Sequence, residues 1–153
     1  MRDATIFDLD GTIANVNHRL PLIFCDKPNW QEFYRACVRD VPNEWCVQLI
    51  KSLARDGIHV NIVTCRSKEV YKETVDWLML VFGNTKNISL HMIREVDDNT
   101  PDTDLKREFL GAFDKDSILF VVEDRPRVVD MYRQEGLTCL QCGFRPEYKR
   151  NKE

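Results

Sequence analysis

Two aspartates one residue apart end the first apolar segment of the chain, in the stretch IFDLDGT. Asp8 and Asp10 have the spacing at which strand side chains share a face, and Gly11 after them permits a sharp turn. That turn frees the second carboxylate to work beside the first. One carboxylate of such a pair can act as a nucleophile while its neighbour donates and removes protons. The pair therefore predicts covalent and acid–base chemistry at the end of a buried strand.

Further polar side chains follow the other apolar segments. They are Thr64, Cys65, Arg66, Arg94, Asp102, Lys106, Glu123, Asp124 and Arg125. Ligands of a parallel sheet bind beyond the carboxyl ends of its strands, so we expect these residues to gather there. Carboxylates from two strand ends would repel one another unless a hard cation such as Mg²⁺ lay among them. The predicted metal ligands are Asp8, Asp10, Glu123 and Asp124.

Phosphate-binding donors are expected on the same edge. The hydroxyl of Thr64 and the cations Arg66 and Lys106 can hold phosphate oxygens. Carboxylates, a magnesium site and phosphate donors on one rim predict phosphoryl transfer. One carboxylate of the pair Asp8 and Asp10 could then attack phosphorus, and its neighbour could protonate the leaving oxygen and later activate a water.

The elements that must position these residues alternate along the chain. Apolar runs predict strands at 4–10, 58–64, 88–93, 117–123 and 137–142, and helical periodicity predicts helices at 44–55, 68–82, 102–113 and 126–136. Strands that alternate with helices of this length are typical of a parallel sheet covered on both faces. The fold class is therefore α/β with a five-stranded parallel sheet.

A short insert separates the first strand from the second. We expect a single domain over residues 1–145, in which residues 14–42 form a small cap-like helical insert, and a polar tail over 146–153. Within the insert, Trp30, Phe33 and Tyr34 have helical spacing, so packing is their default role and a base-stacking platform is the alternative. An insert this small leaves the site poorly covered, which suits a polymer end or a small substrate held by loops.

The composition of the chain limits the kinds of partner and the compartment that we expect for it. The net charge of −3 provides no global basic field for nucleic acid, although only the rim of a site needs to be basic. No apolar run reaches the roughly 20 residues of a membrane span, so no membrane partner is expected. Six cysteines without a secretory signal are expected to be reduced cytoplasmic thiols. Cys139 and Cys142 have the spacing of half a zinc site, but no second such pair exists, so a strand with a buried cysteine is favoured.

The stretch FDLDGT resembles the first motif of the haloacid dehalogenase (HAD) superfamily of phosphotransferases. The other motifs of that superfamily follow in the expected order, at Thr64, at Lys106 and at the acidic pair Glu123–Asp124. The resemblance covers nearly the whole chain. It implies a HAD-like Rossmannoid three-layer sandwich and an Mg²⁺-dependent aspartyl-phosphate mechanism. In that mechanism Asp8 attacks phosphorus, Asp10 is the acid and base, and the metal also binds the backbone carbonyl of Asp10.

Three stretches resemble more closely the 3′-phosphatase domain of phage-type polynucleotide kinase-phosphatases. They are TCRS, REVDDNTPDTDLK and EDRPRVVDMYRQEGLTCLQC. The resemblance implies that Arg66 matches the phosphate-site arginine of that group. The substrate-binding residues that follow are Thr64, Cys65, Arg66, Lys106, Arg125 and Arg94, and the supporting residues are Asp102, Gly11 and Thr12.

The sequence departs from that group at two site positions. Cys65 replaces a glycine, which narrows that turn, and Glu123 replaces an aspartate. The longer Glu123 side chain is expected to reach the metal through a water, which leaves Asp124 as the direct ligand. Asp102 is expected to orient Lys106, because the two lie one helical turn apart.

The sequence favours a cytoplasmic polynucleotide 3′-phosphatase that acts on a phosphorylated nucleic acid end or a nucleotide. The phosphate-loop pattern GxxxxGK[ST] does not occur in the sequence, so no fused kinase domain is expected. That absence and the acidic net charge favour the alternative of a nucleotidase or other small-molecule phosphatase. A catalytically idle HAD-like binding domain is a further alternative, because a fold can persist without its activity.

Overall fold

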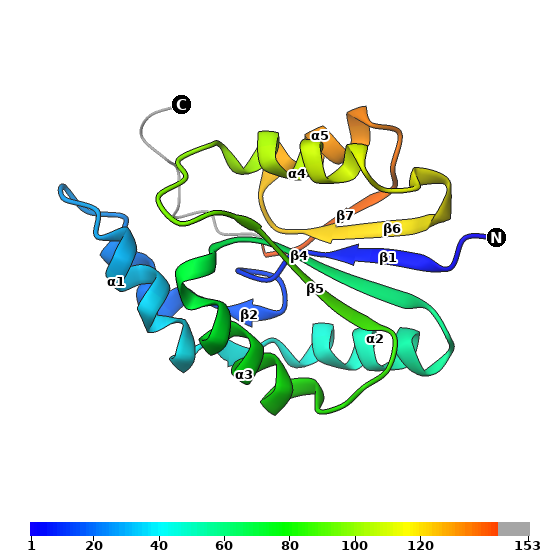
Figure 1. Ribbon diagram of the computed structural model, residues 1–153, viewed down its shortest axis with the longest axis horizontal. Helices are drawn as coiled ribbons and strands as arrows, with labels where there is room; N and C mark the ends of the chain where they lie inside the picture. Colours follow the sequence, from blue (N-terminus) through cyan, green and yellow to red (C-terminus); the bar gives the residue numbers. More distant parts are fainter. Residues whose placement is uncertain (144–153) are drawn as a thin grey trace.

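A five-stranded parallel sheet forms the centre of the molecule in the computed structural model, which describes residues 1–143 (Figure 1). Its strands are β1 (Ala4–Phe7), β4 (His59–Ser67), β5 (Ile88–Arg94), β6 (Ile118–Glu123) and β7 (Cys139–Gln141). They lie in the order β5-β4-β1-β6-β7, and every neighbouring pair is parallel. The carboxyl end of β1 therefore lies between the ends of β4 and β6.

Helices cover both faces of the sheet (Figure 1). They are α2 (Glu44–Arg55) and α3 (Tyr71–Phe82) on one face, and α4 (Asp102–Gly111) and α5 (Pro126–Gln134) on the other. Successive side chains of β1 enter opposite cores, since Phe7 packs with Ile50 of α2 while Ile6 packs with Val129 of α5. Burial on both faces explains the near-continuous apolar run of this strand. The predicted α/β three-layer fold is confirmed.

Most element boundaries agree with their sequence signals. Pro126 occupies the first turn of α5, and Gly83 ends α3 with a φ of +62°. Two strand ends differ. β1 ends at Phe7 rather than at residue 10, and β4 runs to Ser67 rather than Thr64, with a register shift against β5 over these residues. A 3-10 turn, η3 (Lys68–Val70), then precedes α3, and another, η4 (Lys115–Ser117), precedes β6. The irregular end of β4 holds the residues expected to bind phosphate.

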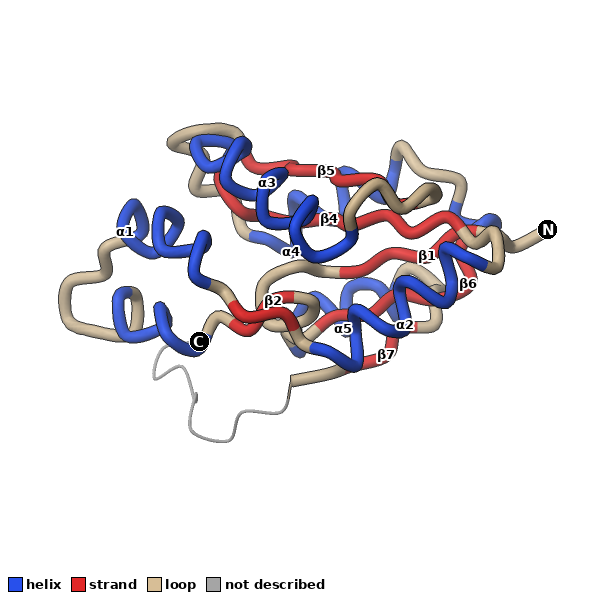
Figure 2. The backbone as a smooth tube through the Cα atoms, turned by 90° about the horizontal axis from the view of Figure 1, so that it is seen from below, coloured by secondary structure: helices blue, strands red, loops and turns tan. Residues whose placement is uncertain are grey.

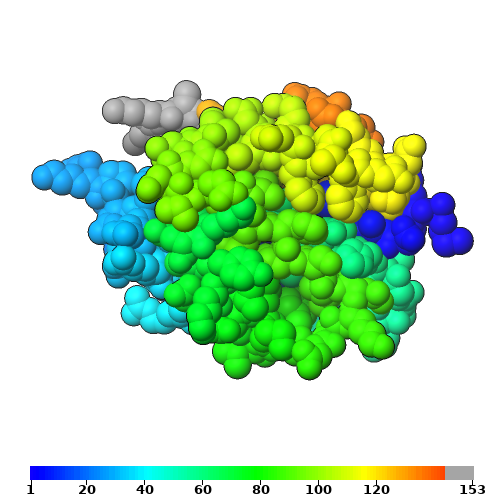
Figure 3. All heavy atoms as spheres, in the orientation of Figure 1, coloured from blue at the N-terminus to red at the C-terminus, as the bar shows by residue number. Residues whose placement is uncertain are grey.

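The insert after β1 is more elaborate than one helix. It contains β2 (Ala14–Asn15), η1 (Asn17–Leu22), α1 (Trp30–Arg35), η2 (Ala36–Arg39) and β3 (Val41–Pro42). The two short strands pair antiparallel and form the stalk of the insert. α1 extends past the carboxyl ends of the sheet strands (Figure 2) and forms one end of the molecule in the space-filling view (Figure 3). The insert thus lies beside the predicted site.

The predicted polar tail, residues 146–153, lies outside the described residues. Within residues 1–143, no helix combines the length and the apolar character needed to cross a membrane.

Candidate active site

The predicted residues meet at the carboxyl end of the central strands. Asp8 and Asp10 follow β1, Thr64 lies near the end of β4, and Asp124 follows β6. A cavity of about 1300 Å³ opens there. Its lining combines these residues with side chains of the insert and of the loop between β5 and α4.

Lys106 enters the site from α4 and is only 2% exposed. Its Nζ donates to Asp8 Oδ1 at 2.6 Å and to Glu123 Oε2 at 2.7 Å. Burial would lower the pKa of Lys106, but the two carboxylates outweigh it and raise the pKa well above its usual value. Thr12 Oγ1 donates to the other oxygen of Asp8 at 3.3 Å. Asp8 is therefore held from both sides in a fixed orientation.

Asp8, Glu123 and Asp124 form the one group of metal-ligating side chains found within the described part of the chain. Their carboxylate oxygens lie within 4.8 Å of one another. Burial, and then the charge of the neighbouring carboxylates, raises the pKa values of Asp8 and Asp124. Asp124 Oδ1 is buried and has no hydrogen-bond partner among the described residues. An all-oxygen donor set with a buried, unsatisfied anionic oxygen fits a hard divalent cation.

Glu123 has little acceptor capacity left for such a cation. Its Oε1 accepts from the backbone amides of Asp124 at 3.1 Å and Arg125 at 3.2 Å, while Oε2 accepts from Lys106. Asp124, by contrast, keeps an unpaired oxygen. The division supports Asp124 as the direct ligand and Glu123 as the group that positions Lys106 and the turn after β6.

Substitutions at the acidic pair should therefore differ in effect. Asp124→Asn should raise the metal concentration for half-maximal activity by about a hundredfold or more, because it removes a direct anionic ligand. Glu123→Gln should raise it by about tenfold, because it perturbs only supporting contacts. Metal titrations of activity, with metal binding by calorimetry, would measure both. Equal effects, or a larger effect for Glu123→Gln, would contradict this division.

Gly11 makes room for Asp124. It has a φ of +87°, and a Cβ on it would lie 2.1 Å from Asp124 Oδ2. The predicted turn is thus also a close approach, which only glycine permits without displacing the carboxylate.

Asp10 points toward two arginines and lies apart from the acidic group. Its Oδ1 accepts from Arg19 Nη2 at 2.7 Å and from Arg66 Nη2 at 2.5 Å. Burial would raise the pKa of Asp10, but Arg66 and Arg19 outweigh it and lower the pKa below its usual range. Asp10 is therefore ionised here, the form of a base. To act as an acid, as expected, Asp10 must first bind a proton, which requires weaker ion pairs with Arg19 and Arg66.

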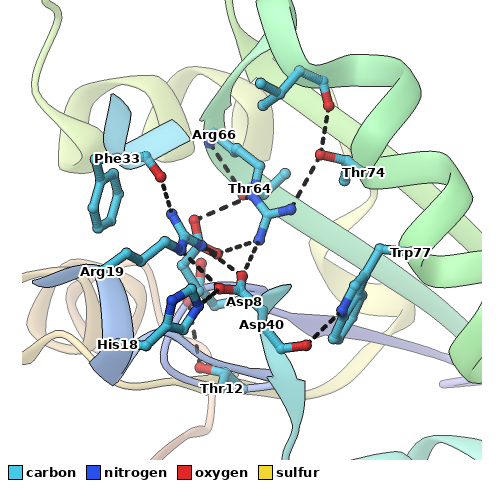
Figure 4. A network of polar contacts seen from close by, with 12 residues as sticks. Asp8, Thr12, His18, Arg19, Phe33, Asp40, Thr64, Arg66, Thr74 and Trp77 are labelled. Carbon is cyan, nitrogen blue, oxygen red and sulfur yellow. Dashed lines mark hydrogen bonds and ion pairs between the residues drawn. The ribbon is translucent and has the colours of Figure 1, made fainter. Parts of the chain in front are cut away.

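Arg66 does not lie open to a phosphate in this structure, contrary to expectation. Its side chain is fully buried and donates to Thr74 Oγ1 at 3.1 Å and to Asp40 Oδ2 at 3.1 Å (Figure 4). It also donates to Asp10. Its backbone amide donates to Thr64 Oγ1 at 3.1 Å, so this hydroxyl supports the end of β4. In this structure Arg66 therefore fixes the position of the Asp10 carboxylate.

Asp40 is a site residue that sequence reasoning missed. Its fully buried carboxylate accepts from His18 Nε2 at 2.8 Å, from Arg19 Nε at 2.8 Å and from Arg66 (Figure 4). Its carbonyl accepts from Trp77 Nε1 of α3 at 2.8 Å. Asp40 thus joins the insert to β4 and α3 through the arginines that hold Asp10. Nothing in its neighbouring sequence distinguishes it from an exposed aspartate of a turn.

Asp40→Asn should destabilise the protein by about 3 kcal/mol, because it leaves two buried guanidinium groups without one of their counter-charges. Urea unfolding measured at pH 8 would determine the change. Asp76→Asn is the matched control, since Asp76 pairs with Lys72 at the surface and its loss should change stability little. Similar stabilities for the two variants would show that the buried network contributes nothing.

Asp102 does not orient Lys106, so that expectation is wrong. Its carboxylate pairs with Arg94 at 2.6 Å and with Arg125, while Lys106 turns inward to Asp8. Side chains four apart on a helix are neighbours, but the stronger long-range partners of each residue separate these two. Asp102 instead joins Arg125 of the α5 N-terminus to Arg94 of β5.

Arg94 is a structural residue rather than an open substrate contact. It is buried and donates to the carbonyls of Cys65 at 2.8 Å, Asp98 at 2.7 Å and Thr100 at 2.8 Å. These bonds shape the loop between β5 and α4. Arg125 is partly exposed at the cavity and remains the candidate substrate arginine.

The cysteines near the site are thiols. Burial raises the pKa of Cys65 to about 12, so this cavity-lining side chain is protonated at neutral pH. Cys139 is buried in β7, as expected of a strand residue, and Cys142 Sγ lies 3.6 Å from Thr12 Oγ1. All six cysteines are unpaired.

A family model for the polynucleotide kinase PNKP phosphatase domain matches residues 2–144 of the chain. The chain belongs to this family. It is a HAD-type phosphatase domain, and the resemblance read from its motifs is confirmed. The PNKP-type phosphatase motifs at Asp8, Lys106 and Asp124 are those that the fold brings together.

Solved structures agree with the PNKP-type assignment. A chain of the Pnkp1/Rnl/Hen1 RNA repair complex is 27% identical with a TM-score of 0.75, and the match covers 91% of this chain and 42% of that one. A second structure of the complex is also 27% identical with a TM-score of 0.75, covering 93% and 46%. The chain thus spans less than half the length of both. CbbY from Rhodobacter sphaeroides, solved with xylulose-1,5-bisphosphate, shares the fold at 17% identity and a TM-score of 0.61, covering 100% and 90%.

Proposed function

We propose that this phosphatase domain is an Mg²⁺-dependent polynucleotide 3′-phosphatase that acts through an aspartyl-phosphate on Asp8. The observation that carries the proposal is the position of Asp8, which Lys106 orients beside the unsatisfied buried oxygen of Asp124. Membership of the PNKP phosphatase family and the likeness to a chain of an RNA repair complex support a nucleic acid substrate.

In the first step, an oxygen of Asp8 forms a bond to phosphorus, the bond from phosphorus to the 3′ oxygen breaks, and Asp10 gives a proton to that oxygen. In the second step, a water attacks the aspartyl-phosphate, Asp10 removes its proton, and phosphate leaves with Asp8 regenerated. Lys106 neutralises charge beside the nucleophile. Asp8, Asp124 and the backbone carbonyl of Asp10 would hold Mg²⁺, which would stabilise the charge of the transferring phosphoryl group.

The two arginines that hold Asp10 connect substrate binding to its protonation. A phosphate dianion attracts the same guanidinium groups, Arg19 and Arg66, that keep Asp10 ionised. When the dianion draws them away, Asp10 gains proton affinity and can serve as the acid of the first step. Arg66 in this way keeps the phosphate role that its motif implies.

A nucleotidase is the second candidate. The net charge of −3 favours a substrate smaller than a strand end. The unpaired state of all six cysteines supports a reducing cytoplasmic location for either activity. An idle binding domain is disfavoured, because the nucleophile, lysine and metal-ligand candidates are all in contact.

Three substrates would separate the candidates: an oligonucleotide with a 3′-phosphate, the same oligonucleotide with a 5′-phosphate, and the corresponding 3′-mononucleotide. Phosphate release would be measured with Mg²⁺, and Asp8→Asn is the blank. We expect the highest kcat/KM for the 3′-phosphorylated oligonucleotide. Preference for the mononucleotide would indicate a nucleotidase, and turnover of none of the three would contradict the proposal.

A further inference from the structure

Aromatic side chains of the insert form one wall of the cavity above the catalytic aspartates. Trp30 and Tyr34 of α1 and the preceding Phe24 all line it. Trp30 is 46% exposed and Phe24 is 40% exposed, and both rings lie at the same cavity rather than scattered over the surface. Phosphoryl transfer at Asp8 does not require these rings, so their exposure at the cavity calls for another role.

The aromatic wall is fixed relative to the catalytic floor. The Trp30 ring meets Phe33 edge-on with centroids 5.6 Å apart and lies 6.1 Å from the Tyr34 ring. Phe33 is buried, and the guanidinium of Arg19 lies 4.3 Å from its ring centre. Because Arg19 also binds Asp10, one side chain connects the wall to the reaction site.

The cavity is too large for a phosphate group alone. Its volume of about 1300 Å³ exceeds the roughly 300–1000 Å³ of pockets that enclose drug-sized ligands. Burial raises the pKa of Tyr34, and the charges of Arg94, Asp102 and Arg125 also act on its hydroxyl. The ring therefore lies within electrostatic reach of the opposite, charged wall. The space between the walls suits a ligand with an aromatic part beside a phosphate.

We propose that Trp30 and Tyr34 form a stacking surface for the nucleobase of the nucleotide that carries the scissile phosphate. The inference rests on the proposed function, because it assigns the base of that same substrate to the insert. Every base has a π face, so the surface accepts all four bases and gives affinity without reading sequence. The aromatic wall and the phosphate floor belong to one continuous cavity, which places both ends of a nucleotide.

Two 3′-phosphorylated oligonucleotides that differ only at the last nucleotide, one with its base and one abasic, test this assignment. The wild-type enzyme should favour the base-containing substrate in kcat/KM by about tenfold or more, mainly through KM. Trp30→Leu keeps apolar bulk but removes the ring, so the preference should fall toward one. Trp30→Phe restores a π face and should recover most of it, and Tyr34→Leu should reduce it.

Trp45 supplies a matched control, because it is 50% exposed on α2 and does not line the cavity. Trp45→Leu should keep the wild-type preference. Equal kcat/KM for the two oligonucleotides in the wild type, or an unchanged preference in both Trp30→Leu and Tyr34→Leu, would overturn the stacking assignment and leave the proposed function standing. Turnover of neither oligonucleotide by the folded wild type would overturn both.

Discussion

Asp8→Asn should reduce phosphatase turnover by at least about a thousandfold while the fold persists. An amide is a far weaker nucleophile than a carboxylate, so the bond to phosphorus does not form. The shape of the side chain is unchanged, and the amide oxygen still accepts from Lys106, which donates to Asp8 at 2.6 Å in the wild type. Phosphate release from an aryl phosphate and from the 3′-phosphorylated oligonucleotide would measure the loss.

The control for this variant is its structure rather than a second activity. Far-ultraviolet circular dichroism and the thermal midpoint should stay close to the wild type, because Lys106 keeps its second partner, Glu123, at 2.7 Å. A folded Asp8→Asn variant that retained a tenth or more of the wild-type rate would contradict the assignment of Asp8 as nucleophile.

Gly11→Ala should cost about a hundredfold or more in kcat/KM and weaken metal binding, although the residue carries no functional group. The added Cβ would lie 2.1 Å from Asp124 Oδ2, so the carboxylate must move away from Asp8 and Glu123. The positive φ of +87° adds backbone strain of about 1–2 kcal/mol. Metal titration of the variant would report the displacement, and urea unfolding the strain.

Gly57→Ala separates the two effects. Gly57 has nearly the same φ, +86°, but a Cβ there would meet nothing within 4 Å, and the residue lies at the far end of the sheet after α2. The Gly57→Ala variant should lose about as much stability to backbone strain as Gly11→Ala, but it should keep the wild-type activity and metal affinity. If Gly57→Ala lost as much activity as Gly11→Ala, general strain rather than the position of Asp124 would explain the effect.

Much of the fold could be predicted because its signals are local. The apolar run over residues 4–10 predicts a strand buried on both faces, and β1 lies within it at Ala4–Phe7. Pro126 and Gly83 lie where the helix boundaries were expected. The end of β4 could not be predicted, because its extension to Ser67 depends on a register shift against β5. Such pairing depends on a distant strand, which local propensity does not report.

The sequence also predicted which residues meet at the carboxyl ends of the strands, but it did not predict which hydrogen bonds they make. Strand-end positions bring Asp8 and Asp124 together in any parallel sheet of this order. Arg66 pairs with Asp40, which is 26 residues away in the chain. Asp102 pairs with Arg125, which is 23 residues away. Only the folded insert shows that Asp40 is buried beside two arginines rather than exposed in a turn.

The measurement that tests the central claim most directly is the isolation of phosphorylated Asp8. Asp10→Asn, supplied with Mg²⁺ and an activated aryl phosphate, needs no acid in the first step but lacks the base of the second. The enzyme should therefore accumulate one phosphoryl group on the peptide that contains Asp8, seen by mass spectrometry after acid quenching. The Asp8→Asn, Asp10→Asn double variant should carry none. Aryl phosphate turnover without phosphate on that peptide, or phosphate on another residue, would contradict the mechanism.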